Sequence, residues 1–169
     1  GASCATHLFN AMSPMVGREP GVVGAVINSH VWSGIICDGF HVDDRMIKLA
    51  LRARPEDDLM FLVSDAMATV GGPALFDLYG QNIHLENGRL INAEGHLAGA
   101  HVTQAEGVAR LVHEIDVSLA QALRMAITVP ALVMGQANLA QLIGRLVRDV
   151  LVLSDDLKVD GTLGQTLSQ

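Results

Sequence analysis

The chain has 169 residues, of which 50% are hydrophobic and 17% charged, and its formal net charge is −7. This length fits one ordinary domain with a sizeable core. The negative charge and the lack of a Lys/Arg cluster argue against nucleic acid and anionic membrane as partners. No run approaches the ~18 consecutive apolar residues of a membrane span. The low charged fraction instead indicates an apolar interface, with a partner or with another part of the same polypeptide.

The two cysteines, Cys4 and Cys37, are too few for a disulfide framework and are not spaced like a zinc knuckle. A reduced, cytoplasmic setting is therefore expected. No export leader is visible. The sequence starts without Met and opens inside a motif, which favours a fragment or a truncated form.

The first part of the chain predicts strands alternating with helices. A Gly/Pro-rich loop at 13–21 leads into a short helix or turn over 21–27. The run V-W-S-G-I-I-C at 31–37 predicts a strand. Apolar residues at helical spacing then predict a helix over 45–54, capped by Asp43 or Asp44.

A second strand is predicted over 59–63, where five apolar residues precede Ser64-Asp65. Such uninterrupted runs are typical of parallel strands that are buried on both faces. The strand–helix–strand order predicts at least one βαβ unit and an α/β fold.

The middle of the chain has a different pattern. The runs 77–85 and 88–92 alternate around Glu86-Asn87-Gly88, which predicts a hairpin. A helix is predicted over 104–115, with its apolar residues on one face. A second helix is predicted over 118–128; Ser118 caps it and it stops before Pro130.

The last part predicts a third short helix over 131–142 and a late strand over 149–153. The polar, small-residue tail from Gly161 is expected to be frayed.

Polar residues follow the last apolar residue of each early strand: His7, then Asp38 and His41, then Asp65. The carboxyl ends of parallel strands meet at one edge, where α/β barrels and open α/β sheets carry their chemistry. The sequence therefore predicts a functional site at this edge.

Four motifs occur in a fixed order along the chain. They are A-T-H-L-F-N-A-M at 5–12, G-R-E-P-G at 17–21, D-G-F-H at 38–41 and L-V-S-D-A at 62–66. Together they resemble the second half of N-acetylglucosamine-6-phosphate deacetylases, which are metal-dependent amidohydrolases. The segments G-H-L-A-G-A at 95–100 and S-L-A-Q-A-L-R-M-A-I-T-V-P-A at 118–131 extend the resemblance to about Leu153.

The resemblance implies an α/β fold: the C-terminal part of a TIM (β/α)8 barrel with strands of an accessory β-sandwich. Residues 1–130 would form the last barrel strands and helices, with a hairpin insertion near 77–92. Residues 131–169 would form a terminal helix, sandwich strands and the frayed tail.

The resemblance also implies two chemical roles. His7 would ligate the catalytic divalent metal, most simply Zn²⁺ or Fe²⁺; without the resemblance, a lone His is more often a packed residue. Asp65 would be the general base, taking a proton from a metal-bound water and later protonating the leaving amine. Its residue type alone fits a helix N-cap equally well.

The implied substrate contacts are Asn10, Ala11, Arg18, His41, Leu97, Ala98 and Gly99. Arg18 would hold the sugar phosphate, across a dimer interface, because a guanidinium suits phosphate geometry; otherwise it is a surface charge. His41 would bind near the reacting carbonyl, or is simply a turn residue. The 97–99 backbone would close over the sugar, or is a plain Gly-rich turn.

The implied reaction is hydrolysis of the acetamide of N-acetylglucosamine 6-phosphate to glucosamine 6-phosphate and acetate. The family protein is much longer, and its first half supplies further barrel strands and further metal ligands, a Glu and a His. His7 and Asp65 alone would hold a metal weakly, since catalytic sites use about three protein ligands. The resemblance therefore implies a homodimer or association with the missing N-terminal half.

Two alternatives stay open. The chain could belong to another amidohydrolase that acts on a different amide or on a cyclic amide. It could also be a non-catalytic half-barrel whose exposed sheet edge and apolar face mediate association.

Overall fold

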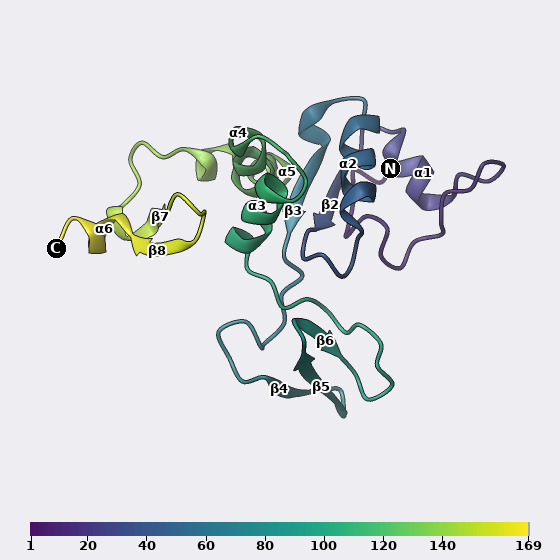
Figure 1. The fold of residues 1–169 in the computed structure, drawn as a ribbon. Coiled ribbons are helices and arrows are strands. Elements are labelled where there is room, and N and C mark those ends of the chain that lie inside the picture. Colours follow the sequence, from purple (N-terminus) through teal and green to yellow (C-terminus); the bar gives the residue numbers. More distant parts are fainter. Residues whose placement is uncertain (169) are drawn as a thin grey trace.

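The computed structural model describes residues 1–168 and has three parts. Figure 1 shows a main body around the sheet β1–β3, a small sheet β4–β6 beneath it, and a C-terminal arm that carries β7, β8 and α6. Among the described residues, no helix has the length and hydropathy needed to cross a membrane.

The main sheet contains three parallel strands in the order β1-β2-β3. They are β1 (Cys4–Ala5), β2 (Trp32–Ile36) and β3 (Met60–Val63). Ala5 pairs with Ser33, and Ile36 pairs with Val63. The α/β prediction is thus confirmed, but within residues 1–168 the sheet does not close into a barrel.

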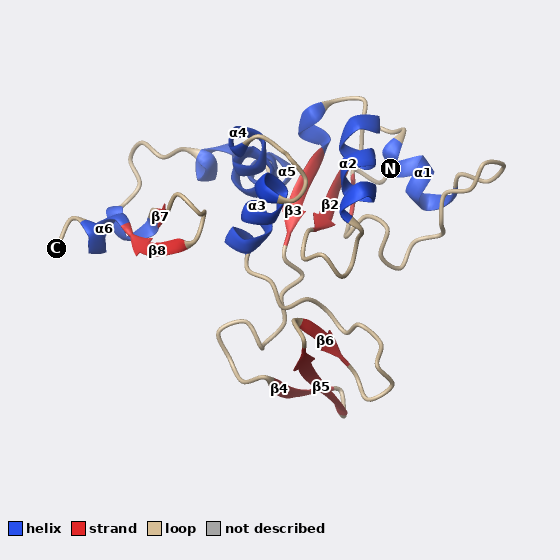
Figure 2. Ribbon diagram, viewed as in Figure 1, coloured by secondary structure: helices blue, strands red, loops and turns tan. Residues whose placement is uncertain are grey.

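Helices are grouped around this sheet, whereas no helix of residues 1–168 lies on the sheet β4–β6 (Figure 2). They are α1 (Gly21–Ile27), α2 (Asp44–Ala53), α3 (Gln104–His113), α4 (Leu119–Leu123) and α5 (Val129–Val133). The caps explain where two of them begin: Asp43 accepts a hydrogen bond from the backbone N–H of Arg45, and Thr103 and Glu106 form a capping box.

One apolar core joins the sheet to these helices. Its fully buried side chains include Leu8 after β1, Ile35 and Met60 in the sheet, Ile47 in α2 and Leu111 in α3. Burying an aliphatic side chain of this size contributes about 1.5–3 kcal/mol. Because these residues come from every layer, the core fixes the ends of the strands relative to the helices.

The helix predicted to stop before Pro130 continues through it. A π-helical turn at Arg124–Thr128 joins α4 to α5, and the backbone N–H of Val129 bonds to the carbonyl of Arg124. Pro130 lies in the first turn of α5, directly after the π-helical turn, so its missing N–H falls where the hydrogen-bond pattern changes from π to α. The predicted helix over 131–142 is also wrong, because the chain turns at Gly135 (φ +66°) and only a 3-10 turn follows, at Ala137–Ala140.

The small sheet has one strand more than predicted: β4 (Leu75–Leu78), β5 (Gln81–Glu86) and β6 (Arg89–Ile91). The hairpin at Asn87-Gly88 is confirmed. The run 77–85 is two strands because Tyr79-Gly80 turns the chain, both residues having positive φ as hairpin turns of this kind need.

The C-terminal arm pairs β7 (Leu151–Leu153) with β8 (Val159–Thr162) in antiparallel fashion and ends in α6 (Leu163–Thr166). The tail from Gly161, which is expected to be frayed, instead completes β8 and forms α6. Its sequence contains a cap that our prediction missed, since Thr162 and Gln165 form a capping box at the start of α6.

Candidate functional site

Three polar residues occupy equivalent positions at the carboxyl edge of the main sheet. His7, Asp38 and Asp65 each lie two residues beyond the end of their strand, β1, β2 and β3 respectively. This is the edge at which parallel α/β sheets place functional groups. The prediction that the strand ends share one edge is confirmed by the parallel pairing.

The loop after β1 is held in a constrained conformation. The backbone N–H of Leu8 donates to the carbonyl of Gly34 (2.8 Å), and the N–H of Asn10 donates to the carbonyl of His7 (2.9 Å). His7, Phe9 and Ala11 all have positive φ, at 28°, 79° and 53°. Such conformations cost about 1–3 kcal/mol each in residues other than glycine and gather at functional sites. Holding the loop in this conformation therefore lowers the stability of the fold, and it places His7 at the end of β1.

The imidazole of His7 has a nitrogen without a partner. Its Nδ1 is buried and makes no hydrogen bond within residues 1–168. A buried polar atom in this state is costly unless it serves a ligand. His7 can therefore offer one donor to a metal ion, but no three His, Cys, Asp or Glu side chains in the described part of the chain gather as a metal site would need.

Asp65 does not cap a helix, because the segment after it is a bridge at Ala66 followed by a turn. The cap interpretation is thus excluded. Asp65 is exposed and has a φ of 49°, and among residues 1–168 its carboxylate makes no hydrogen bond or ion pair. The backbone therefore holds this carboxylate at the strand end with both oxygens available to a ligand.

The 97–99 loop lies directly against Asp65. The N–H of Ala100 donates to the carbonyl of Asp65 (3.0 Å), and the N–H of Met67 donates to the carbonyl of Ala100 (3.1 Å). Ala98 donates to the carbonyl of Leu90, which fastens the loop to β6. The structure thus brings together Asp65 and the predicted loop Leu97, Ala98 and Gly99.

Gly99 is the tightest point of this contact. It has a φ of +88°, and a Cβ built on it would lie 2.4 Å from Cγ of Met67. Gly99→Ala is expected to lower the free energy of unfolding by about 1–3 kcal/mol and to disturb Asp65. Urea unfolding of the variant measures this loss.

Gly95→Ala is the matched control for Gly99→Ala. Gly95 has a similar φ of +82°, but a Cβ there would meet nothing within 4 Å. The difference between the two variants therefore isolates the contact with Met67. Equal losses of stability would contradict a tight approach at Gly99.

His41 lies next to Asp38, a residue for which the sequence predicts no role of its own. Its Nδ1 is 2.6 Å from Oδ2 of Asp38, and both side chains are more than nine-tenths buried. Burial alone would raise the pKa of Asp38, but hydrogen bonds from the His41 ring and from the N–H groups of His41 and Phe40 hold that pKa below its ordinary value. The three-residue spacing in D-G-F-H was the available signal, since it lets the Asp side chain fold back over the turn.

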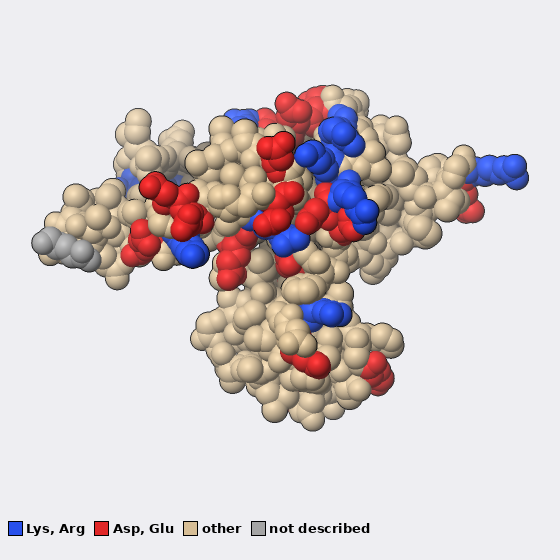
Figure 3. Space-filling view, viewed as in Figure 1, with Lys and Arg blue, Asp and Glu red and all other residues tan. Residues whose placement is uncertain are grey.

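Arg18 stands apart from the other predicted residues. The loop between β1 and α1 extends away from the body as an arm in Figure 1, and its tip carries a positive charge in Figure 3. The arm closes through a bridge between Val16 and Glu19, and within residues 1–168 Arg18 is exposed and makes no hydrogen bond or ion pair. The structure therefore does not place Arg18 beside Asp65 or His41.

The candidate site is accordingly assembled only in part. Asp65 is joined to the 97–99 loop, His41 to Asp38, and Asn10 to His7, but no hydrogen bond links these three groups within the described residues. A groove of about 590 Å³ lies elsewhere, between α3, the π-helical turn and the segment 139–153, and none of the predicted site residues lines it.

Comparisons with known proteins find relatives of this chain by sequence. No family model matches the chain. It is 39% identical to the N-acetylglucosamine-6-phosphate deacetylase of Haemophilus influenzae over 139 residues, which are 80% of this chain and 36% of that protein. An Escherichia coli (strain K12) protein named as a candidate N-acetylgalactosamine-6-phosphate deacetylase is 32% identical over 131 residues, which are 76% of this chain and 77% of that protein.

A solved structure shows the same likeness. The crystal structure of N-acetylglucosamine-6-phosphate deacetylase from Pasteurella multocida matches with a TM-score of 0.88 and 37% identity, over 96% of this chain and 43% of that one. The chain thus spans less than half the length of this structure and of the Haemophilus relative. By sequence and by structure, the chain belongs to the family of N-acetylglucosamine- and N-acetylgalactosamine-6-phosphate deacetylases.

Proposed function

We propose that this chain is the C-terminal portion of an enzyme that hydrolyses the acetamide of N-acetylglucosamine 6-phosphate to glucosamine 6-phosphate and acetate. The observation that carries this proposal is the geometry of Asp65, a free carboxylate in left-handed backbone at the end of β3, bonded through its backbone to the 97–99 loop. The two cysteines are both free, as suits the proposed cytoplasmic setting.

In this proposal Asp65 moves the proton of the reaction. It accepts a proton from the water that attacks the acetamide carbon, and it returns that proton to the leaving amine as the C–N bond breaks. His41 binds the substrate near the carbonyl. The sugar is bound by Asn10, Ala11 and the backbone of Leu97, Ala98 and Gly99. Because Asp65 and this loop are bonded to each other, binding of the sugar and proton transfer share one rigid segment.

The described residues do not fit a complete metal site by themselves, since no cluster of three ligands is present among residues 1–168. We propose that His7 supplies one ligand of a divalent ion, Zn²⁺ or Fe²⁺, through the imidazole whose Nδ1 is unpaired. The other ligands would come from a second copy of the chain or from an N-terminal half of the family protein.

Arg18 is proposed to bind the 6-phosphate of a substrate that is held by a second copy of the chain, across a dimer interface, and it makes no hydrogen bond or ion pair within the described residues. Arg18→Gln is expected to raise KM for N-acetylglucosamine 6-phosphate roughly 10- to 100-fold, since it removes a charge-assisted hydrogen bond. KM for unphosphorylated N-acetylglucosamine should change little. Steady-state kinetics with both substrates measures the difference.

Arg148→Gln is a matched control, because Arg148 is also exposed and its ion pair with Asp149 is long, at 3.9 Å. It should leave both KM values unchanged. Equal effects of Arg18→Gln on the two substrates would contradict a phosphate contact and would favour an amidohydrolase that acts on a different amide.

The proposed function is tested by assaying the purified chain for glucosamine 6-phosphate release, with the metal content determined on the same sample. N-acetylgalactosamine 6-phosphate serves as the competing substrate, because relatives of both kinds match this chain. Turnover that is lost in Asp65→Asn would support the proposal. Absence of turnover with Zn²⁺ or Fe²⁺ supplied would contradict catalysis by this chain alone.

A second candidate function is association without catalysis. The sheet β1-β2-β3 has two outer strands with no further pairing among residues 1–168, and large apolar side chains such as Leu142, Ile143 and Leu151 are exposed. Unpaired edges and apolar surface favour pairing with another chain. A chain that is inactive, binds no metal and is oligomeric by light scattering would fit this second function.

A further inference from the structure

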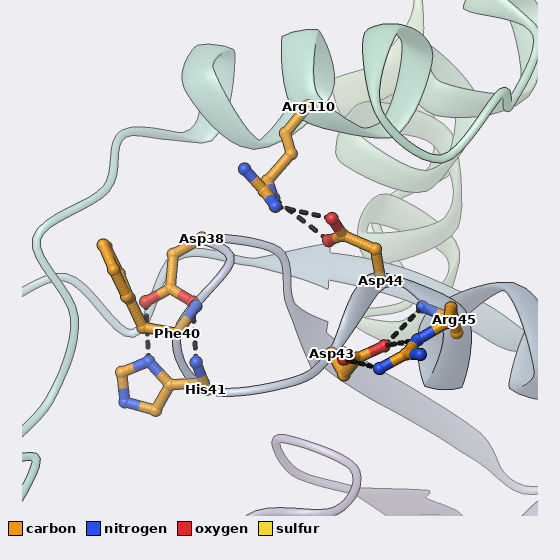
Figure 4. A network of polar contacts seen from close by, with 7 residues as sticks. All are labelled: Asp38, Phe40, His41, Asp43, Asp44, Arg45 and Arg110. Atoms are coloured by element: carbon orange, nitrogen blue, oxygen red, sulfur yellow. Dashed lines mark hydrogen bonds and ion pairs between the residues drawn. The ribbon is translucent and has the colours of Figure 1, made fainter.

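The loop D-G-F-H after β2 is organised around one carboxylate. Oδ1 of Asp38 accepts hydrogen bonds from the backbone N–H groups of Phe40 and His41, both at 2.9 Å. Oδ2 pairs with Nδ1 of His41 at 2.6 Å, as the dashed lines in Figure 4 show. The two oxygens thus have separate tasks: Oδ1 shapes the turn and Oδ2 holds the imidazole.

This pairing determines which ring nitrogen carries the proton. The pKa of Asp38 lies below its ordinary value, so the carboxylate is ionised near neutral pH and can only accept hydrogen bonds. Nδ1 of His41 must therefore donate. The other nitrogen, Nε2, points away from Asp38 in Figure 4 and makes no hydrogen bond within residues 1–168. Nε2 is thus the atom left to contact a ligand.

The rest of the loop is fixed from two helices. Arg110 of α3 donates to both carboxylate oxygens of Asp44 at the start of α2, at 3.1 and 2.6 Å. Its guanidinium also covers Gly39, where a Cβ would lie 2.6 Å from Cζ of Arg110. Gly39 has a φ of +81°, so the turn needs glycine for its backbone and for the approach of Arg110. Asp38 and His41 therefore lie in a loop whose position is fixed by α2 and α3.

We propose that Asp38 is a positioning residue: it fixes the tautomer and the orientation of His41 so that Nε2 faces the substrate. The link to substrate rests on the proposed function, whereas the tautomer rests on the geometry alone. In other enzymes, a carboxylate orients a functional histidine in this way by accepting a hydrogen bond from the ring nitrogen that does not contact the substrate or metal.

The direct test is ¹⁵N NMR of the His41 ring in the purified chain, recorded over a pH series that extends into the alkaline range. The native chain is expected to show a protonated Nδ1 and an unprotonated Nε2. The opposite tautomer would overturn the proposal without any variant being made.

Asp38→Asn separates the two tasks of the carboxylate. The amide oxygen can still accept from the N–H groups of Phe40 and His41, but an NH₂ group replaces Oδ2 and donates where the carboxylate accepted. The His41 ring is then expected to move its proton to Nε2. An unchanged tautomer would contradict the proposal.

Kinetics of the same variant tests the functional half. Asp38→Asn is expected to lower kcat/KM about 10- to 100-fold, as loss of an orienting partner does in other sites. Asp43→Asn is the matched control, since Asp43 is an exposed Asp nearby that also accepts from backbone N–H and does not touch His41. It should change neither the tautomer nor kcat/KM.

The variant must also act through His41. In a His41→Gln background, Asp38→Asn should cause no further loss of kcat/KM. An equal loss in both backgrounds would overturn the positioning role. If the native chain shows the expected tautomer but no turnover, catalysis by this chain alone is contradicted while the assignment of Asp38 to the tautomer stands.

Discussion

Asp65→Asn is expected to reduce kcat about 10²- to 10⁴-fold and to change KM little. This is the range that a positioned general acid–base contributes, and an amide cannot take the proton. The backbone should tolerate the change, because asparagine adopts left-handed φ as readily as aspartate and Asp65 has a φ of 49°. The loss is measured by steady-state kinetics on N-acetylglucosamine 6-phosphate.

Asp116→Asn is the matched control. Asp116 is also in left-handed backbone, with a φ of 64°, and its side chain is almost fully exposed. It should retain native kcat and native thermal stability. If Asp65→Asn also kept native kcat, the assignment of Asp65 as the proton carrier would be wrong and the chemistry would need another group.

The regular part of the body could be predicted from the sequence because its signals are local. The apolar run at 59–63 and the capped helix after Asp43 needed only residues that are neighbours in the chain. The parallel pairing of β2 with β3 then places Asp38 and Asp65 at one edge of the sheet. Fold class and the location of the candidate site thus followed from short-range patterns.

The sequence predictions are wrong where the folded chain overrides a local signal. Pro130 predicts the end of a helix, yet a π-helical turn before it lets the helix continue. The split of the run 77–85 could have been found, since Tyr79-Gly80 is a turn, but the alternation of apolar residues hid it.

The role of Asp38 could not be predicted from residue types alone. An Asp-Gly pair after a strand is first of all a turn signal. Only the folded loop shows that one oxygen makes the turn while the other meets His41. Arg54 is a second example, because an Arg at a helix end usually lies in solvent.

Arg54 carries the largest expected effect on stability. Its guanidinium is buried at the end of α2 and donates to the carbonyls of Val26 and Val31, and to that of Leu59 at 3.3 Å. These carbonyls belong to α1 and to the residues that precede β2 and β3. Burial lowers the pKa of Arg54, and the carbonyl oxygens around the guanidinium compensate the cost of burying its charge.

Arg54→Met is therefore expected to lower the free energy of unfolding by about 3 kcal/mol, since it removes the hydrogen bonds of the buried guanidinium to three carbonyls while it keeps the apolar stem. For a domain of this size the melting temperature should fall by roughly 6–12 °C. Differential scanning calorimetry measures both quantities.

Arg52→Met provides the matched control, because Arg52 lies on the same helix and is exposed. A surface substitution of this kind should change stability by at most about 0.5 kcal/mol. Arg54→Lys sharpens the argument, since one ammonium cannot reach three carbonyls in the way a planar fork can, and it should recover only part of the loss. If Arg54→Met were as stable as Arg52→Met, the buried guanidinium would not hold α1, β2 and β3 together. The apolar core alone would then align the strand ends that carry His7, Asp38 and Asp65.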